Sequence, residues 1–186
     1  MKNPKVYMLI GVPGAGKTTF LKKNAPHGSI AIVSTQSIIK DVMKKESCDY
    51  AAAYDKAKET IAETISRRIS LLTERNKSII IDQSNHTYGN RLKKFRLIPD
   101  HYERIGIVFN APYNILRGGF LQLKTKEGMA MSEAEWKSTF YDKFQPPVPV
   151  ERFSRILNGL ELENAPWDEK AFSEEMAVKN RLSRAK

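Results

Sequence analysis

The sequence has little of what disulfide-bonded, zinc-binding and membrane proteins need. Its 186 residues contain one cysteine, Cys48, which excludes an internal disulfide and suits a reducing compartment. There are three histidines, and His27 and His101 have no partner at metal-ligand spacing, so no zinc site is expected. No apolar run approaches the ~20 residues of a membrane helix, and no signal peptide precedes the first apolar run. We therefore expect a cytoplasmic protein without a membrane partner.

Acidic residues are also scarce relative to basic ones. The chain has 31 Lys and Arg against 21 Asp and Glu, a formal net charge of +10. The excess lies in residues 1–160, because residues 161–186 hold five basic and six acidic residues. One bound nucleotide does not require so much positive charge, so the balance favours a polyanionic partner, with nucleic acid, and DNA first, as the expected one. A basic surface that serves only solubility is the alternative.

The strongest motif is GVPGAGKT at residues 11–18, which matches the phosphate-binding P-loop (Walker A) pattern G-x-x-x-x-G-K-S/T. Glycines let the backbone curl so that its N–H groups point at phosphate, and a helix that begins near Lys17 adds its positive dipole end. Lys17 would neutralise the β- and γ-phosphates, and Thr18 would offer a hydroxyl ligand to Mg²⁺. The residues expected to bind ATP are Gly11, Val12, Pro13, Gly14, Ala15, Gly16, Lys17, Thr18 and Thr19.

Short apolar runs alternate with longer amphipathic stretches along the chain, which predicts an α/β fold. The expected strands cover residues 6–10, 30–33, 78–81 and 104–109, and together they should form a parallel sheet with helices on both faces. The expected helices cover residues 18–23, 38–45, 50–76 and 91–98, and a further helix opens at 111–114. Ligands in such sheets bind at the carboxyl ends of the strands.

The remaining segments set the expected domain organisation. Residues 1–160 should form the catalytic domain, and residues 161–186 a helical extension. A Lys- and Gly-rich segment at about 121–132 predicts a mobile lid over the phosphates, because transfer to an acceptor requires that water be excluded. The proline-rich residues 144–149 read as an extended connector.

A second cluster of polar residues follows the third predicted strand. Asp82 ends this strand, which is the position of a Walker B acid that orders Mg²⁺. Thr18 and Asp82 are therefore the expected metal-binding residues.

The segment Ile80–Asn85 followed by Arg91 resembles the D-x-S/T-N…R segment of polynucleotide 5′-hydroxyl kinases, phage enzymes among them. The P-loop is similar to theirs, including Pro13, and so are residues 141–147 and 151–157. The resemblance implies the P-loop kinase fold and transfer of the γ-phosphate of ATP to a nucleic-acid hydroxyl. This broad group also includes phage kinases that phosphorylate 5-hydroxymethyluracil in DNA. If a phage encodes the protein, its compartment is the cytoplasm of the host cell.

The resemblance also implies roles for individual residues. Lys17, Asp82 and Arg117 would be catalytic, and Gln36 stands where the family has the Asp that acts as general base. The family's second lid arginine falls on Leu121, and either Lys124 or Lys126 would replace its charge, though not its bidentate geometry. The expected substrate-binding residues are Thr35, Gln36, Lys40, Asn85, Arg91 and Lys124.

Two other functions stay open at this stage. Residues 33–40 are loosely similar to the acceptor pocket of adenylate kinases, in which Thr35 and Lys40 would hold the phosphate of a nucleoside monophosphate. Such an acceptor is already anionic and needs no general base. The other alternative is an ATP-binding protein in which the loss of the acid at position 36 has impaired transfer.

Overall fold

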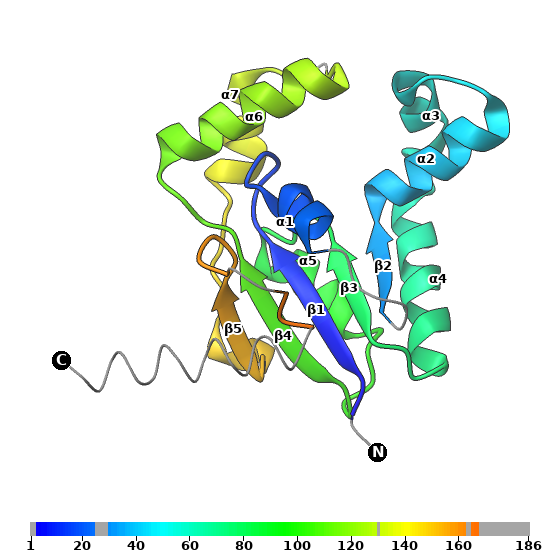
Figure 1. Cartoon of the computed structure of the whole chain (residues 1–186), viewed down its shortest axis with the longest axis vertical. Helices are drawn as coiled ribbons and strands as arrows, with labels where there is room; N and C mark the ends of the chain where they lie inside the picture. Colours follow the sequence, from blue (N-terminus) through cyan, green and yellow to red (C-terminus); the bar gives the residue numbers. More distant parts are fainter. Residues whose placement is uncertain (1–2, 25–29, 130, 163–164, 168–186) are drawn as a thin grey trace.

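A parallel sheet forms the centre of the molecule, as predicted, and it has five strands where four were expected. The computed structural model describes residues 3–24, 30–129, 131–162 and 165–167. The strand order is β2-β3-β1-β4-β5 and every neighbouring pair is parallel (Figure 1). The strands are β1 (Lys5–Ile10), β2 (Ala31–Ser34), β3 (Ile79–Asp82), β4 (Glu103–Val108) and β5 (Arg155–Asn158).

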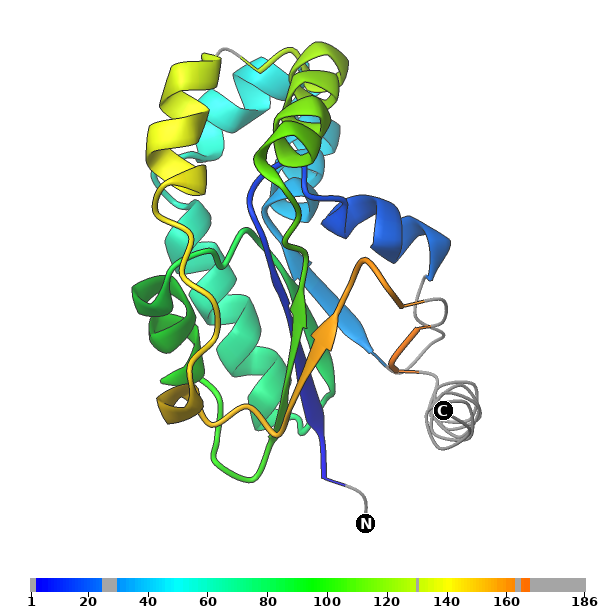
Figure 2. The same cartoon turned by 90° about the vertical axis from the view of Figure 1, so that its left-hand side faces the viewer.

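Helices cover both faces of this sheet. Helix α1 lies on one face, and α4 and α5 lie on the other (Figure 2). The helices are α1 (Lys17–Lys23), α2 (Thr35–Glu46), α3 (Tyr50–Ala57), α4 (Ile61–Glu74), α5 (Tyr88–Phe95), α6 (Tyr113–Glu127) and α7 (Glu133–Trp136). A π-helical turn at Lys137–Tyr141 and a 3₁₀ turn at Pro149–Glu151 follow.

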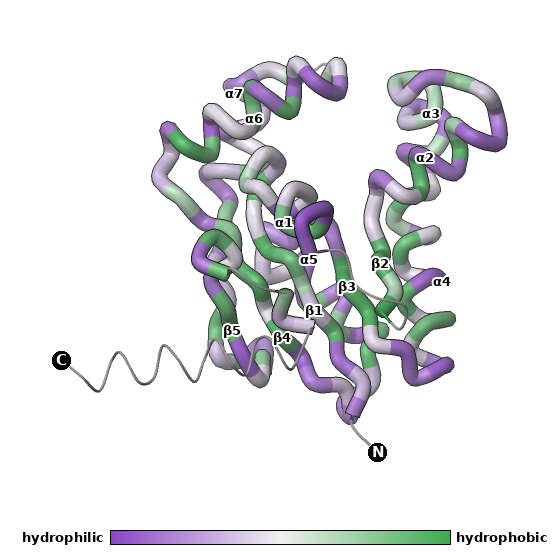
Figure 3. Tube along the Cα trace, in the orientation of Figure 1, coloured by the Kyte–Doolittle hydropathy of each residue, from purple (hydrophilic) through white to green (hydrophobic). Residues whose placement is uncertain are grey.

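The central strand β1 divides the core into two halves. Tyr7 and Leu9 pack in the cluster that includes α1, whereas Val6, Met8 and Ile10 pack with α4 and α5. This alternation follows from the two-residue period of a strand, and burial on both faces explains why β1 is apolar from Val6 to Ile10. The hydrophobic colour in Figure 3 is accordingly concentrated along the central strands. Within the described residues, none of the helices has the length and apolar character of a membrane span.

The single helix predicted over residues 50–76 is wrong, because the chain turns between α3 and α4. At this turn, the backbone N–H and the hydroxyl of Thr60 both donate to the carbonyl oxygen of Ala57, at 2.9 and 3.1 Å. These bonds satisfy the end of α3 and let the chain change direction. Threonine forms such local bonds readily, and apolar periodicity does not report them.

The predicted lid also takes a different form. Residues 121–127 are the last turns of α6, and Gly128 ends the helix with a φ of +62°, so the segment is not a loop up to that point. Strand β5 was not predicted, because its four residues alternate between half-buried and exposed at the sheet edge. The predicted helical extension at 161–186 falls largely on residues outside the described part of the chain. Of its residues, 161–162 and 165–167 are described and are not helical, and Trp167 packs edge-on against Tyr7 and Phe20.

Helix α6 packs directly on the P-loop, backbone against backbone. A Cβ atom on Gly119 would lie 2.2 Å from the carbonyl oxygen of Gly14, and one on Gly14 would lie 2.4 Å from the backbone nitrogen of Phe120. The indole N–H of Trp136 donates to the carbonyl oxygen of Pro13 at 3.1 Å, and the Trp136 ring stacks on Phe120. The α6–α7 pair is therefore fixed to the loop by contacts that only glycine permits.

This contact predicts a difference between two adjacent glycines of α6. Gly119→Ala should lower the free energy of unfolding by about 1–3 kcal/mol, because the methyl group meets the loop backbone. Gly118→Ala is the matched control, since a Cβ there meets nothing within 4 Å and alanine favours a helix by up to about 1 kcal/mol. Urea unfolding of both variants measures the difference, and equal stabilities would contradict the packing.

Candidate functional site

The functional loops meet at the carboxyl edge of the sheet. Ser34 of β2 pairs in register with Asp82 of β3, and Asp82 pairs with Leu9 of β1. The P-loop leaves β1 beside Asp82, and the N–H of Gly11 donates to the carbonyl oxygen of Ser84 at 2.8 Å. Parallel pairing thus brings together three segments that are far apart in the sequence.

The P-loop has the geometry that its glycines predict. Gly14 and Gly16 adopt φ values of +86° and +94°, and α1 begins at Lys17 directly after the loop. Above the loop lies a cavity of about 280 Å³. It is lined by Pro13, Gly14, Ala15, Gly16, Lys17, Thr18, Thr19 and Lys22, by Gln36 of α2, and by Gly119, Gln122, Leu123, Lys126 and Glu127 of α6.

Lys17 and Asp82 form the electrostatic centre of the site. The Lys17 ammonium is 8% exposed and donates to the carbonyl oxygens of Gly11 and Val12, at 2.7 and 2.9 Å. Burial lowers the pKa of Lys17 to about 8, and the negative charge of Asp82 partly opposes this shift. Burial likewise raises the pKa of Asp82, against the effect of Lys17. Each group thus favours the charged form of the other in a site that otherwise disfavours charge.

The chemistry of the side chains fits a nucleotide-bound Mg²⁺ and not a metal held by protein alone. Among the described residues, no group of three His, Cys, Asp or Glu side chains could hold a metal. Thr18 lines the cavity and Asp82 lies at the strand end beside Lys17. A hydroxyl and one carboxylate are a sufficient protein contribution for Mg²⁺, which keeps waters and takes its other ligands from phosphates.

The loop after β3 packs against the end of β1 and the start of the P-loop, and none of its side chains lines the cavity. The side-chain amide of Asn85 is buried and donates to the carbonyl oxygen of Leu9 at 2.7 Å. Arg91 is fully buried and forms a two-pronged ion pair with Glu151, at 2.6 and 2.8 Å. It also donates to the carbonyl oxygens of Asn85 and Gln145. Both side chains are therefore used internally and neither lines the cavity, so the predicted substrate-binding role of Asn85 and Arg91 stays a prediction without support from this geometry.

The predicted arginine of the lid lies on the other side of α6. Arg117 is half-exposed and pairs with Glu133 of α7 at 2.5 Å, and neither it nor Lys124 lines the cavity. The lining positions 119, 122, 123 and 126 follow helical spacing, and 117 falls on the opposite face. The catalytic role predicted for Arg117 and the substrate role predicted for Lys124 therefore do not fit the structure. Lys126 is the α6 cation at the cavity.

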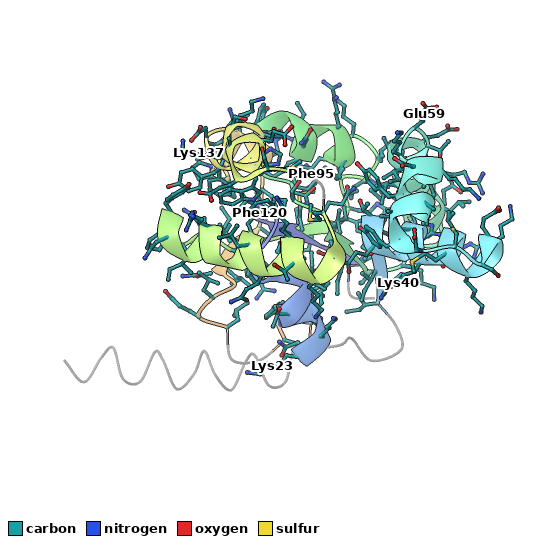
Figure 4. The ribbon with its side chains drawn as sticks, turned by 90° about the horizontal axis from the view of Figure 1, so that it is seen from above. Lys23, Lys40, Glu59, Phe95, Phe120 and Lys137 are labelled. Carbon is teal, nitrogen blue, oxygen red and sulfur yellow. The ribbon has the colours of Figure 1, made fainter. Side chains whose placement is uncertain are left out.

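The start of α2 contributes Gln36 to the wall of the cavity. Gln36 lines the cavity, whereas the Thr35 hydroxyl accepts from Gln83 at 3.1 Å, and Lys40 is exposed further along the helix. Seen from above, α6 extends toward α2, where Lys40 is labelled (Figure 4). The amide of Gln36 donates to the carboxylate of Glu127 at 2.7 Å and so links the two helices across the cavity.

Sequence reasoning missed Glu127 and Gln122 as cavity residues, and it named Lys126 only as the alternative to Lys124 for the charge of the lid. The signal was present in the helical spacing, but residues 121–132 were read as a loop, so no face was assigned to them. Had α6 been extended to Glu127, the position of Gly119 against the P-loop would have placed positions 122, 123 and 126 over the phosphates.

The comparisons with known proteins agree with this fold. A family model described as an AAA domain matches residues 6–146, so the chain belongs to this family. A protein from Chloroflexus aurantiacus that carries a kinase assignment is 16% identical over all of both chains, with a TM-score of 0.63.

Two further solved structures have similar folds. A chain of the Pnkp1/Rnl/Hen1 RNA repair complex is 18% identical, with a TM-score of 0.56, over 78% of this chain and 47% of its own. A gluconokinase from Sinorhizobium meliloti is 13% identical, with a TM-score of 0.51, over 85% and 83%. These likenesses establish the P-loop kinase fold, which the sequence predicted.

The lowered pKa of Lys17 predicts a pH dependence of stability. An unfolded lysine holds its proton up to about 10.5, whereas the folded one releases it near 8. Between these values the unfolded state binds more protons, so the free energy of unfolding should rise with pH. Lys17→Met should remove about 2 kcal/mol of the rise between about pH 7.5 and about pH 9.5. Urea unfolding at the two pH values tests this, and identical rises in the variant and the unmodified protein would contradict it.

The buried ion pair predicts a large structural effect away from the cavity. Arg91→Met should cost about 3–5 kcal/mol of unfolding free energy, because Glu151 would be left buried and unpaired. Lys93→Met is the matched control in the same helix, since Lys93 is exposed and should change stability by less than about 0.5 kcal/mol. Denaturant titration distinguishes them. A small effect of Arg91→Met would return this residue to the candidates for substrate binding.

Proposed function

We propose that this protein transfers the γ-phosphate of ATP to a hydroxyl group of a nucleic acid, either a 5′-hydroxyl end or a hydroxymethylated base in DNA. The observation that carries the proposal is the cavity over the P-loop, which combines Lys17 and Thr18 with side chains of α2 and α6. A donor held by the loop would therefore face residues that can receive an acceptor. The P-loop kinase fold supports the same reading.

The residues around the loop have distinct proposed roles. Backbone N–H groups of residues 11–19 would hold the phosphates of ATP, and Lys17 would turn from the carbonyl oxygens of Gly11 and Val12 to the β- and γ-phosphate oxygens. Thr18 and Asp82 would hold Mg²⁺, which supplies positive charge against the phosphate oxygens. Lys22 and Lys126 add positive charge at the cavity. Little covalent work falls to the protein, so positioning and charge neutralisation dominate.

Two observations favour a nucleic-acid acceptor over a free nucleotide. The positive excess of the chain lies in residues 1–160, which we propose as the catalytic domain. The cavity of about 280 Å³ is just below the range for small-molecule sites, ~300–1,000 Å³, so it leaves no room to enclose two nucleotides. An acceptor that enters only by its reacting end fits this space. The fold of a protein from an RNA repair complex is also similar.

The experiment follows label from γ-labelled ATP in the presence of Mg²⁺. The acceptors are 5′-hydroxyl oligonucleotides, end-blocked DNA that contains hydroxymethyluracil, and free nucleoside monophosphates. We expect label on one of the DNA substrates, and Lys17→Ala should reduce transfer by at least ~10²-fold because the charge clamp is lost. Lys23→Ala is the control, since Lys23 is an exposed residue of the same helix outside the cavity (Figure 4).

Three other results of the label-transfer experiment would change the proposed function or the assignment of the P-loop. Label on a free nucleoside monophosphate alone would make the protein a nucleotide kinase. Binding of ATP without transfer to any acceptor would make it an ATP-binding protein. Full activity of Lys17→Ala would contradict the assignment of the P-loop itself.

A further inference from the structure

The proposed reaction needs a group that accepts a proton, and the proposed roles of the P-loop residues do not include one. A hydroxyl acceptor loses its proton as its oxygen bonds to phosphorus, and a side chain that takes this proton contributes roughly 10²–10⁴ in rate. Gln36 lies on the acceptor side of the cavity, but an amide cannot take a proton as a carboxylate can. The proton acceptor must therefore come from another position.

Neither Asp82 nor Asp41 is placed to take the proton. Asp82 lies beside Lys17 and is the proposed ligand of Mg²⁺. Asp41 lies one turn along α2 from Gln36, pairs with Arg68 at 2.6 Å and does not line the cavity. Of the described residues that do line it, Glu127 is the one with a carboxylate.

Glu127 is also held in a defined position. It is the last residue of α6, it is half-buried, and its Oε1 atom accepts from Gln36 at 2.7 Å. Within the described part of the chain, no hydrogen bond to its Oε2 atom is present, so this oxygen remains available. The Glu127 charge also acts on Tyr50 at the start of α3, where it adds to burial in raising the pKa of the phenol. The carboxylate therefore faces α2 across the cavity and lies close enough to Tyr50 to act on its phenol.

We infer that Glu127 is the general base of the reaction and that Gln36 is a positioning residue that orients its carboxylate. This inference rests on the proposed function and assigns to α6 a catalytic group that would otherwise be sought on α2. The acceptor hydroxyl would enter between the two helices, beside Gln36, with the γ-phosphate of ATP on the P-loop side. The anchoring of α6 through Gly119 would keep Glu127 at a fixed height above the loop.

The step balances with these groups alone. The acceptor oxygen forms a bond to the γ-phosphorus, and the bond from that phosphorus to the bridging oxygen of the β-phosphate breaks. The electron pair of the broken bond leaves with ADP, and the proton of the hydroxyl passes to the Oε2 atom of Glu127. The products are a phosphomonoester and ADP, and the proton returns to solvent afterwards.

The test compares two substitutions that separate catalysis from the link between the helices. Glu127→Gln keeps an oxygen that can accept from Gln36 but removes the base, so transfer to the hydroxyl acceptor should fall by about 10²–10⁴-fold. Gln36→Ala removes the link but keeps the base, and a smaller, roughly tenfold, loss is expected. ATP affinity, measured with a fluorescent analogue, and the melting temperature should stay near those of the unmodified protein in both variants.

Glu59→Gln provides the matched control. It is the same substitution at an exposed residue of the turn between α3 and α4, which Figure 4 labels away from α6, and its transfer rate should equal that of the unmodified protein. Equal losses in Glu127→Gln and Gln36→Ala would mean that the pair only joins the helices and would overturn the assignment. Undiminished transfer by Glu127→Gln would overturn it as well. No transfer by the unmodified protein would instead overturn the proposed function, and this inference with it.

Discussion

The contact between Gly14 of the P-loop and Gly119 of α6 is the constraint on which the site depends. A side chain at either position would meet backbone atoms of the other segment, so the two segments approach as closely as polypeptide allows. Trp136 reinforces the contact, because its indole N–H bonds to Pro13 while its ring stacks on Phe120. A phosphate-binding loop needs glycines to curl around phosphate. Here one of the same glycines also fixes the helix that covers it.

The rest of the site follows from this attachment. Because α6 contacts the P-loop at Gly119 and extends from there toward α2 (Figure 4), its cavity face brings Lys126 and Glu127 to the cavity over the P-loop, and Glu127 opposite Gln36. The loop after β3 is held by the buried ion pair of Arg91 and Glu151. Arg91 also donates to the carbonyl oxygen of Asn85, and the Asn85 side chain bonds to the end of β1. One attachment therefore positions the α6 wall of the cavity, and the other supports the strand end that presents Asp82.

Sequence patterns predicted the parts of the molecule that depend on local chemistry. The P-loop, four of the strands and the position of Asp82 are each encoded by residue types at fixed spacing, and the fold class follows from their order. The turn that separates α3 from α4 involves a bond from the Thr60 hydroxyl, which periodicity does not reveal. Strand β5 is short, lies at the sheet edge and has no buried face. The internal role of Arg91 depends on a partner 60 residues away. A cationic side chain in a motif predicts ligand binding or burial equally well until that partner is known.

The most direct test of the account is a structure of the protein with a non-hydrolysable ATP analogue, Mg²⁺ and a short 5′-hydroxyl oligonucleotide. The account predicts phosphates on the N–H groups of the P-loop, Lys17 turned from Gly11 and Val12 to the phosphate oxygens, and the terminal hydroxyl between Gln36 and the Glu127 carboxylate. An analogue bound away from the P-loop, or an oligonucleotide whose hydroxyl lies remote from α2 and α6, would contradict it.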